Sequence, residues 1–290
     1  MASRTVSLAG KVVAITGGAR GIGKATAAAF LDQGAAVVIG DIDDELASKT
    51  AVELGARPGA QVTGLPLDVT DRDSFARFLD EADAAFDAPV DVLVNNAGIM
   101  PTGLHVDEAE RMTDRQLDIN LRGVITGSKL AVTRFLQRGS GHLVNIASLA
   151  GVTGYPGLAT YCATKHGVVG FTEALWGELH DGPVGISMVL PAVVRTELSA
   201  GANVPRSMER LTTVNPEDVA AAVVDAVVHD RPKVVVPKSA GVMLASMSLL
   251  PTRAKFALGR WMKLDVMFTE SDPVARARYH QRIAGQEQSS

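Results

Sequence analysis

Short β-branched runs alternate with helical segments along most of this 290-residue chain, and the alternation limits the folds that it can adopt. Strands are expected over residues 11–16, 36–41, 62–68, 91–95, 142–146, 186–190 and 233–237. Helices are expected over residues 22–33, 71–86, 108–137, 157–180 and 216–229. Because the strands are apolar on both faces, they are typical of a parallel sheet covered by helices on both sides. The pattern predicts a doubly wound α/β fold of Rossmann type, which binds ligands at the carboxyl ends of its strands.

The expected organisation is a single domain over residues 8–238, followed by a C-terminal extension over residues 239–290. Hydrophobic residues make up 47% of the chain, and its formal net charge of -4 gives no sign of a general nucleic-acid binder. The one cysteine, Cys162, excludes an intrachain disulfide and fits a reducing compartment. Without an apolar stretch of signal-peptide length at the N-terminus, or a later run of ~18 apolar residues, a soluble cytoplasmic protein is expected.

A glycine-rich turn, Thr16-Gly-Gly-Ala-Arg-Gly-Ile-Gly23, joins the first expected strand to the first helix. Gly17, Gly21 and Gly23 admit a tight turn, in which backbone N–H groups of Arg20, Ile22 and their neighbours can meet a pyrophosphate at the helix N-terminus. Such a turn alone is often only a turn. The strand before it, the helix after it and an acid that ends the second strand favour a dinucleotide site.

That acid is Asp41, placed where a carboxylate can accept hydrogen bonds from both ribose hydroxyls of NAD. The same carboxylate would repel the additional phosphate of NADP. Arg20 argues in the other direction, because a cation next to Gly21 could reach that phosphate. NAD is the expected cofactor and NADP the less favoured alternative. No metal site is expected.

A tyrosine and a lysine, Tyr161 and Lys165, stand four residues apart on an expected helix, thirteen residues after Ser148. Residues i and i+4 share a helix face, so phenol and ammonium would point into the same space. A free tyrosine titrates near ~10, and a neighbouring cation is expected to lower that value. The pair alone could be a solvated surface pair, and its meaning depends on the other motifs.

These motifs together closely resemble the short-chain dehydrogenase/reductase family, over about residues 10–237. The resemblance implies an adenine contact from Asp68-Val69 and a turn, Asn95-Asn-Ala97-Gly98, that borders the adenosine ribose and steadies the sheet. It also implies a catalytic tetrad of Asn120, Ser148, Tyr161 and Lys165. Read singly, Asp68 and Asn95 could be ordinary turn formers and Asn120 a helical polar residue without a task.

The chain departs from the family pattern after the sixth expected strand, where Pro-Gly is usual. Here the sequence is Pro191-Ala192-Val-Val-Arg-Thr196. Pro191 and Thr196 match, and the resemblance implies that Thr196 contacts the nicotinamide carboxamide. The methyl group of Ala192 restricts the backbone, so a different loop path is expected there.

The predicted reaction is hydride transfer between NAD(H) and a secondary alcohol or ketone, with Tyr161 as general acid–base and Ser148 holding the substrate oxygen. The resemblance implies that Lys165 also binds the nicotinamide ribose and that Asn120 anchors a water in a proton relay. The alternative is a catalytically silent NAD(P)-sensing protein that has kept the fold. An intact tetrad argues against this alternative.

The substrate is the least constrained part of the reaction. The family resemblance places a substrate-lining segment at about residues 197–214, which here includes Leu198, Val204, Met208 and Leu211. The extension after residue 238 is rich in methionine and aromatic residues, which favours a bulky hydrophobic substrate. This extension could cover the substrate or pack on its own or a neighbouring subunit, and a basic amphipathic helix on a membrane surface is a less favoured interpretation. The resemblance also implies a homodimer or homotetramer, formed through the helices at 108–137 and 157–180.

Overall fold

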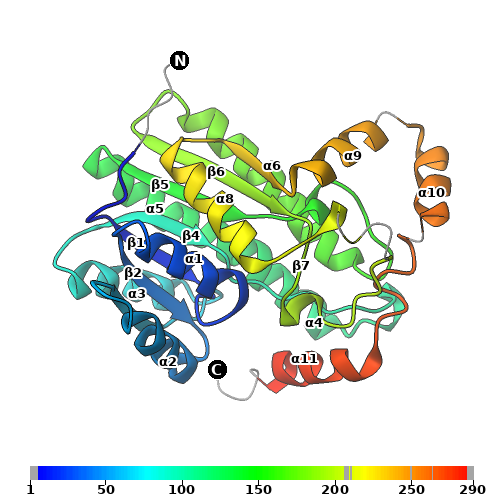
Figure 1. The fold of residues 1–290 in the computed structure, drawn as a ribbon, viewed down its shortest axis with the longest axis horizontal. Coiled ribbons are helices and arrows are strands. Elements are labelled where there is room, and N and C mark those ends of the chain that lie inside the picture. Colours follow the sequence, from blue (N-terminus) through cyan, green and yellow to red (C-terminus); the bar gives the residue numbers. More distant parts are fainter. Residues whose placement is uncertain (1–5, 206–208, 210, 249, 263, 286–290) are drawn as a thin grey trace.

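Seven parallel strands form the central sheet of the chain, shown in Figure 1 as a computed structural model. The structure describes residues 6–205, 209, 211–248, 250–262 and 264–285. The strands follow the order β3-β2-β1-β4-β5-β6-β9. They are β1 (Val12–Thr16), β2 (Ala36–Asp41), β3 (Gln61–Pro66), β4 (Val90–Asn95), β5 (Gly141–Ile146), β6 (Val184–Pro191) and β9 (Lys233–Val236). The predicted doubly wound α/β fold is confirmed.

Helices cover both faces of this sheet, because successive side chains of each strand point to opposite sides. Val13 and Ile15 of β1 pack in one core with α1 and α8, whereas Val12 and Ala14 pack in a second core with α3 and α5. The helices of the two layers are α1 (Gly21–Leu31), α2 (Asp44–Gly55), α3 (Arg72–Ala85), α5 (Gly123–Arg138), α6 (Ala159–Leu179) and α8 (Pro216–Val228). The strands therefore end at one common edge, where residues distant in sequence meet.

Three features differ from the expected boundaries. Helix α2 was not expected, because its buried face consists largely of small residues such as Ala47 and Ala51, which give a weak apolar pattern. The third strand ends at Pro66, so Asp68 lies in the loop that follows it. The expected helix over 108–137 is three elements, namely α4 (Glu110–Leu117), a π-helical turn (Asp118–Arg122) and α5. Such π turns occur frequently at functional sites, and Asn120 lies at the centre of this one.

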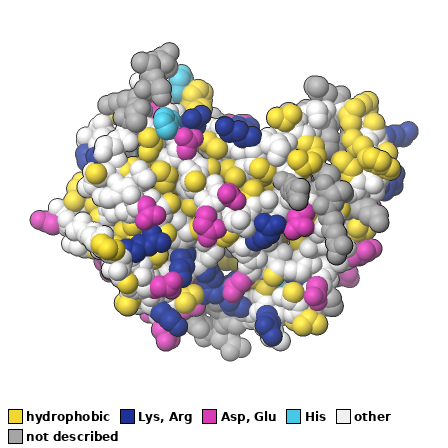
Figure 2. All heavy atoms as spheres, in the orientation of Figure 1, with side chains coloured by type: hydrophobic (Ala, Val, Ile, Leu, Met, Phe, Trp, Pro, Cys, Tyr) yellow, Lys and Arg dark blue, Asp and Glu magenta, His cyan; other side chains and the backbone are white. Residues whose placement is uncertain are grey.

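The C-terminal extension forms α9 (Lys238–Ser248), α10 (Thr252–Trp261) and α11 (Pro273–Gly285). Helices α9 and α10 project from the body, while α11 returns beside α4 (Figure 1). Hydrophobic side chains gather over α10 in Figure 2, where Phe256 is 55% and Trp261 81% exposed. Across the described ranges, no helix has the length and apolar character to cross a bilayer. The same residues bring no group of three or more His, Cys, Asp or Glu side chains together as a metal site.

Candidate active site

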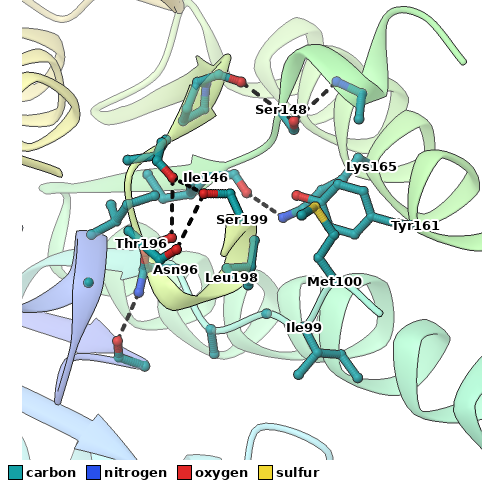
Figure 3. A pocket seen from close by; sticks show the side chains of 18 of the residues that line it. Asn96, Ile99, Met100, Ile146, Ser148, Tyr161, Lys165, Thr196, Leu198 and Ser199 are labelled. Carbon is teal, nitrogen blue, oxygen red and sulfur yellow. Dashed lines mark hydrogen bonds between the residues drawn. The ribbon is translucent and has the colours of Figure 1, made fainter. Parts of the chain in front are cut away.

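A cavity of about 730 Å³ lies at the carboxyl edge of the sheet, and Figure 3 shows part of its wall. It is bounded by the ends of β1, β2, β4, β5 and β6 and by α6. The expected site residues that line it are Gly17, Arg20, Gly21, Ile22, Asp41, Asp68, Val69, Ala97, Gly98, Ser148, Tyr161, Lys165, Pro191 and Thr196. Those that do not line it are Gly23, Asn95 and Asn120. Most residues singled out in the sequence thus meet around one space.

The glycine turn forms the floor at the end of β1. Gly17 and Gly21 have φ values of +63° and +53°, in the left-handed region that favours glycine. A Cβ atom on Gly23 would lie 2.2 Å from the carbonyl oxygen of Gly17, so only glycine permits helix α1 to approach the turn this closely. Gly23 therefore allows the close packing of the turn, although it does not line the cavity itself. The Arg20 side chain occupies the N-cap position without capping α1, which leaves the first-turn amides of that helix to an anion.

Asp41 ends β2 with a buried carboxylate on the wall of the cavity. It accepts hydrogen bonds from the backbone N–H groups of Ala19 and Asp43, both at 3.2 Å. Burial raises the pKa of Asp41, while these two hydrogen bonds and the charge of Arg20 lower it. The carboxylate is consequently fixed in place and tied to the glycine turn.

Arg20 is engaged by two acids. Its guanidinium lies 2.7 Å from the carboxylate of Asp43 and 3.8 Å from that of Glu197. Glu197 also forms an ion pair with Arg282 of α11. The positive charge of Arg20 is therefore partly neutralised by Asp43 and Glu197 of the same chain.

The turn after β4 is joined to the glycine turn by Asn96, whose side-chain amide donates hydrogen bonds to the carbonyl oxygens of Thr16 and Gly17 at 2.9 and 3.0 Å. A Cβ atom on Gly17 would lie 2.8 Å from Cα of Ala97, which shows how closely the two turns pack. Ala97 and Gly98 reach the cavity from this turn. On the far side, Asp68 accepts a hydrogen bond from the backbone N–H of Thr70 at 2.9 Å.

Asn95 does not reach the cavity, so its expected place beside a cofactor is corrected. Its side-chain amide donates to Oδ1 of Asn145 at 2.9 Å and to Oγ of Ser128 at 3.2 Å. The alternation of side chains along β4 directs it into the layer formed by α5, where it joins β4 to β5. Asn96, its neighbour in the same motif, lines the cavity instead.

Helix α6 directs Tyr161 and Lys165 into the cavity opposite the end of β5 (Figure 3). Both are buried, and the Lys165 ammonium lies 5.8 Å from the centre of the Tyr161 ring. Lys165 donates a hydrogen bond to the carbonyl oxygen of Ile146 at 2.9 Å. Ser148 follows β5, and its hydroxyl accepts from the N–H of Ala150 at 3.1 Å. A hydroxyl, a phenol and an ammonium group therefore converge on one wall.

The protonation equilibria of this wall differ from the sequence-based expectation. Burial raises the pKa of Tyr161, although a hydrogen bond with Ser148 lowers it in part. Burial lowers the pKa of Lys165 from its ordinary 10.5 to about 8. Desolvation disfavours the charged form of each group, and it is the largest cause of both shifts. Without a bound cofactor, the raised pKa of Tyr161 keeps its phenol protonated at neutral pH.

Asn120 stands behind this wall, in the π-helical turn. Its side chain accepts from the N–H of Ile99 and donates to the carbonyl of Ile99, both at 2.8 Å. It also donates to the hydroxyl of Thr164 at 3.3 Å, within the helix that carries Tyr161 and Lys165. Asn120 thereby connects the turn after β4 to α6 without touching the cavity.

Pro191 ends β6, and the chain then crosses towards the glycine turn. The N–H of Ala192 donates to the carbonyl of Val236 at 2.8 Å, which extends the pairing of β6 with β9. Its backbone is not in the left-handed region, so the added methyl fits this path. A Cβ atom on Gly21 would lie 3.4 Å from Cγ2 of Thr196, which places Thr196 directly beside that turn.

Comparison with known proteins decides the family. A family model described as short chain dehydrogenase matches residues 11–206. The chain belongs to the short chain dehydrogenase family. Its matched region contains the glycine turn, the Tyr161 and Lys165 pair and the loop with Thr196, so the motifs and the family coincide. The resemblance inferred from the sequence is confirmed.

Two curated relatives illustrate how the chain compares with other oxidoreductases. It is 34% identical over 238 residues to the probable oxidoreductase EphD of Mycobacterium tuberculosis, where the match covers 76% of this chain but 40% of EphD. The chain thus spans about two fifths of the length of that relative. It is 36% identical over 226 residues to the 1-deoxy-11-beta-hydroxypentalenate dehydrogenase of Streptomyces exfoliatus, with 76% of this chain and 81% of the relative covered.

A solved structure of a short chain dehydrogenase/reductase from Burkholderia phymatum, in complex with NAD, has a similar fold. The TM-score is 0.75 at 28% sequence identity, and the match covers 83% of this chain and 93% of the other. The sheet and its helices are therefore those of this dehydrogenase family.

The cavity of this family member has a predominantly apolar end. Leu198 lines it, as expected, whereas Leu211 is 45% exposed and does not, so that expectation was wrong. Val204 packs against the apolar cluster near Tyr161, and Met208 lies outside the described residues. Tyr155 and Leu158 also line the cavity, and so do Met243, Leu264, Met267 and Phe268 of the C-terminal extension, which the sequence singled out for its methionine and aromatic residues.

Sequence reasoning missed a buried arginine beside this end of the cavity. Arg276 of α11 is 3% exposed and donates to the carbonyl oxygens of Met100 and Leu198 at 2.6 and 2.7 Å. No motif marks Arg276, which follows Tyr161 by more than a hundred residues. Asn96 could have been found, since period-two alternation along the strand separates it from Asn95.

Proposed function

We propose that the chain is an NAD-dependent oxidoreductase that interconverts a bulky hydrophobic secondary alcohol and its ketone, with Tyr161 as general acid–base. The observation that carries this proposal is the convergence of Ser148, Tyr161 and Lys165 on one wall of a cavity whose floor is the glycine turn. A reacting oxygen beside the phenol would thus share one space with a dinucleotide on the turn.

The residues around the glycine turn fit a dinucleotide. Gly17 and Gly21 adopt left-handed backbone, and Gly23 lets α1 begin against the turn, as a pyrophosphate-binding turn requires. Asp41 would hold ribose hydroxyls, Asp68 and Val69 would border the adenine, and Thr196 would meet the nicotinamide end. When bound, NAD(H) would supply or accept the hydride.

Charge at the ribose position favours NAD over NADP. Asp41 faces the cavity, and Arg20, the cation whose charge acts on it, is held by Asp43 at 2.7 Å. An additional phosphate would meet the Asp41 carboxylate and an arginine whose charge is already shared. Both effects disfavour NADP.

The reacting groups have separate tasks in this proposal. Tyr161 would transfer the proton to or from the substrate oxygen, and Ser148 would donate a hydrogen bond to that oxygen. Lys165, fixed by the carbonyl of Ile146, would stabilise the phenolate as it forms and bind ribose hydroxyls. Asn120 would act from behind by holding the main chain of Ile99.

Replacement of Tyr161 by Phe tests the proposal. We expect kcat for ketone reduction with NADH to fall at least ~100-fold, as for a lost general acid, while NAD affinity stays within about twofold. Near-normal turnover by the Tyr161→Phe variant would overturn the role of Tyr161. Tight NAD binding by the wild-type protein, without oxidation or reduction of any alcohol or ketone in a broad panel, would favour the NAD(P)-sensing alternative.

We also propose a homodimer or homotetramer built through α5 and α6. Gly170 has open space at its Cα, and Ala159 and Ala163 are exposed, so the outer face of α6 permits close approach of a second helix. Gly167 packs against its own chain and not towards a second helix, because a Cβ atom there would lie 2.9 Å from Leu121. Sedimentation equilibrium of the wild-type protein tests this assembly, and a monomer at micromolar concentration would contradict it. The cytoplasmic location suggested by Cys162 stays a prediction.

A further inference from the structure

The C-terminal part of the chain, residues 264–283, crosses the apolar end of the cavity, and we call this segment the strap. It begins after α10 and ends in α11, which lies beside α4 (Figure 1). Tyr279 and Ile283 of the strap are buried together with Ile99, which follows β4. The strap is thus packed on the body of its own chain.

Backbone hydrogen bonds join the strap to the loop after β6. The N–H of Asn203 donates to the carbonyl of Met267 at 2.8 Å, and the N–H of Asp272 donates to the carbonyl of Gly201 at 2.9 Å. Gly201 has a φ of +78°, and a Cβ atom there would lie 2.9 Å from the carbonyl oxygen of Asp272. The two segments therefore form one unit of structure.

Arg276 joins this unit to the loop after β4. Its guanidinium donates to the carbonyl oxygens of Leu198 and Ala200 at 2.7 and 3.3 Å, and to that of Met100 at 2.6 Å. Its guanidinium carbon lies 4.8 Å from the ring centre of Tyr279, whose hydroxyl accepts from the N–H of Met100 at 2.8 Å. The strap consequently holds both main-chain groups of Met100.

The buried position of Arg276 is costly. It is 3% exposed, and no carboxylate within the described residues lies within 4.0 Å of it. A guanidinium stays charged in proteins, so carbonyl dipoles and the Tyr279 ring must compensate its lost hydration. Such an arrangement is explained by a need to position the two loops that it binds, one with Met100 and one with Leu198 and Ala200.

The strap residues that line the cavity are Leu264, Met267, Phe268, Arg282 and Ile283. Met267 and Phe268 are 2% and 6% exposed and belong to the same buried cluster as Tyr161 and Met100. The Phe268 ring packs edge-to-face on Tyr155, with centres 6.0 Å apart. Met267 and Phe268 therefore add uncharged side chains to the part of the cavity wall beside Tyr161.

We infer that the strap sets which substrates this enzyme takes, with Met267 and Phe268 as the residues that limit the size of the apolar group on the reacting carbon and Arg276 as the residue that positions them. The inference rests on the proposed function and names its substrate class more closely, as uncharged ketones and secondary alcohols with one extended apolar substituent. A carboxylate on that substituent would be desolvated against Met267 and Phe268 and is disfavoured.

A homologous series of 2-alkanones, from 2-butanone to 2-tridecanone, tests the inference. Binding of each ketone in the presence of NADH is measured from the thermal shift of the protein, and kcat/KM from NADH oxidation. We expect the Phe268→Ala and Met267→Ala variants to prefer chains longer by at least two carbons than the chain that the wild-type protein prefers. Phe256→Ala is the matched control, because Phe256 is 55% exposed on α10 and should leave the preferred length unchanged.

Arg276→Met tests the positioning role, with Arg278→Met on the exposed side of α11 as its control. We expect Arg276→Met to raise KM at least tenfold for the longer ketones and to flatten the dependence of affinity on chain length, with the NAD dissociation constant within twofold of wild type. A lower Tm with an unchanged length profile would assign Arg276 a structural role only.

The outcomes separate the two proposals. An unchanged length preference in both alanine variants, with wild-type turnover intact, would overturn the role of the strap and leave the proposed function standing. A shifted length preference in binding, with no turnover by any protein, would support the strap and contradict the proposed function.

Discussion

Asn120 and Ile99 are joined by two hydrogen bonds of 2.8 Å, one to each main-chain group of Ile99. The pairing spans the π-helical turn and the loop after β4, which also carries Ala97 and Gly98. An extra residue in a helical turn is unfavourable unless it gains contacts, and these two bonds are such contacts. The loop on the cofactor side is therefore fixed by a residue that the cavity does not expose.

We expect Asn120→Leu to destabilise the protein, because a side chain of similar size would leave two buried main-chain groups of Ile99 without partners. Each such group costs about 1–3 kcal/mol, so the free energy of unfolding should fall by about 3 kcal/mol. Urea denaturation measures this change. Asn203→Leu, at an exposed position, serves as the control and should shift stability by less than about 0.5 kcal/mol. Equal stabilities for the two variants would contradict the assignment.

Stability should rise with pH in alkaline solution because of Lys165. Its pKa falls from 10.5 to about 8 on folding, so between these values the unfolded chain binds more protons than the folded chain. The burial penalty is thus fully present below pH 8 and is relieved as the pH increases towards 10, by up to about 3 kcal/mol. Urea unfolding at about pH 7.5 and about pH 9.5 samples this range. The free energy of unfolding should be higher at the higher pH in the wild-type protein but not in Lys165→Met. Parallel slopes for the two proteins would show that another group titrates.

Cofactor preference should depend on the charge of Asp41. Asp41→Asn keeps a side-chain acceptor near Ala19 and removes the negative charge, so NADP(H) should bind about tenfold more tightly and NAD(H) more weakly. Calorimetric titration with all four nucleotides at one ionic strength measures the change. Asp44→Asn removes the same charge at an exposed position and should leave the preference as it is. A wild-type preference for NADP(H) would mean that Arg20 outweighs Asp41.

Two helical glycines should respond in opposite directions to alanine. A Cβ atom on Gly127 of α5 would lie 2.3 Å from Cζ of Phe75 and 2.6 Å from Oδ1 of Asn95, so Gly127→Ala should destabilise the protein by about 1–3 kcal/mol. Gly170 of α6 has no atom within 4 Å of the same position, and Gly170→Ala should add about 1 kcal/mol of helix stability in the monomer. Thermal unfolding distinguishes the two. Equal shifts would show that the packing around Gly127 can relax.

The sequence predicted the sheet well, because the central strands β1, β2, β4, β5 and β6 are buried along almost their whole length and read as largely apolar runs. Helix α2 escaped notice because Ala47 and Ala51 pack close to the sheet without forming a marked apolar stripe. The division of the expected helix over 108–137 could not be predicted from the sequence either. A π-helical turn is defined by a shifted backbone hydrogen bond and is not marked by a particular residue type.

The sequence indicated which glycines and acids at the strand ends line the cavity, namely Gly17, Gly21, Asp41 and Asp68, and their contact with a cofactor stays a prediction. Asn95 was assigned to the cavity because the face of β4 to which its side chain points was not considered. The alternation of side chains along the strand directs it towards Ser128 of α5 instead. The pKa of Tyr161 could not be judged, because burial is a property of the fold and not of the spacing to Lys165. Arg276 lay beyond prediction, since its partners are main-chain oxygens that every residue possesses.

Because Arg276 binds the two loops only through main-chain oxygens, the residues that it binds there can be substituted during evolution. Arg276 binds Met100, Leu198 and Ala200 only through their carbonyl oxygens. The attachment is therefore indifferent to the side chains at these three positions, and mutations there leave the guanidinium contacts intact. If the proposed function holds, selection for a new substrate could change the side chains of these loops while Arg276 keeps their backbone in register, and one arginine would make this end of the cavity evolvable.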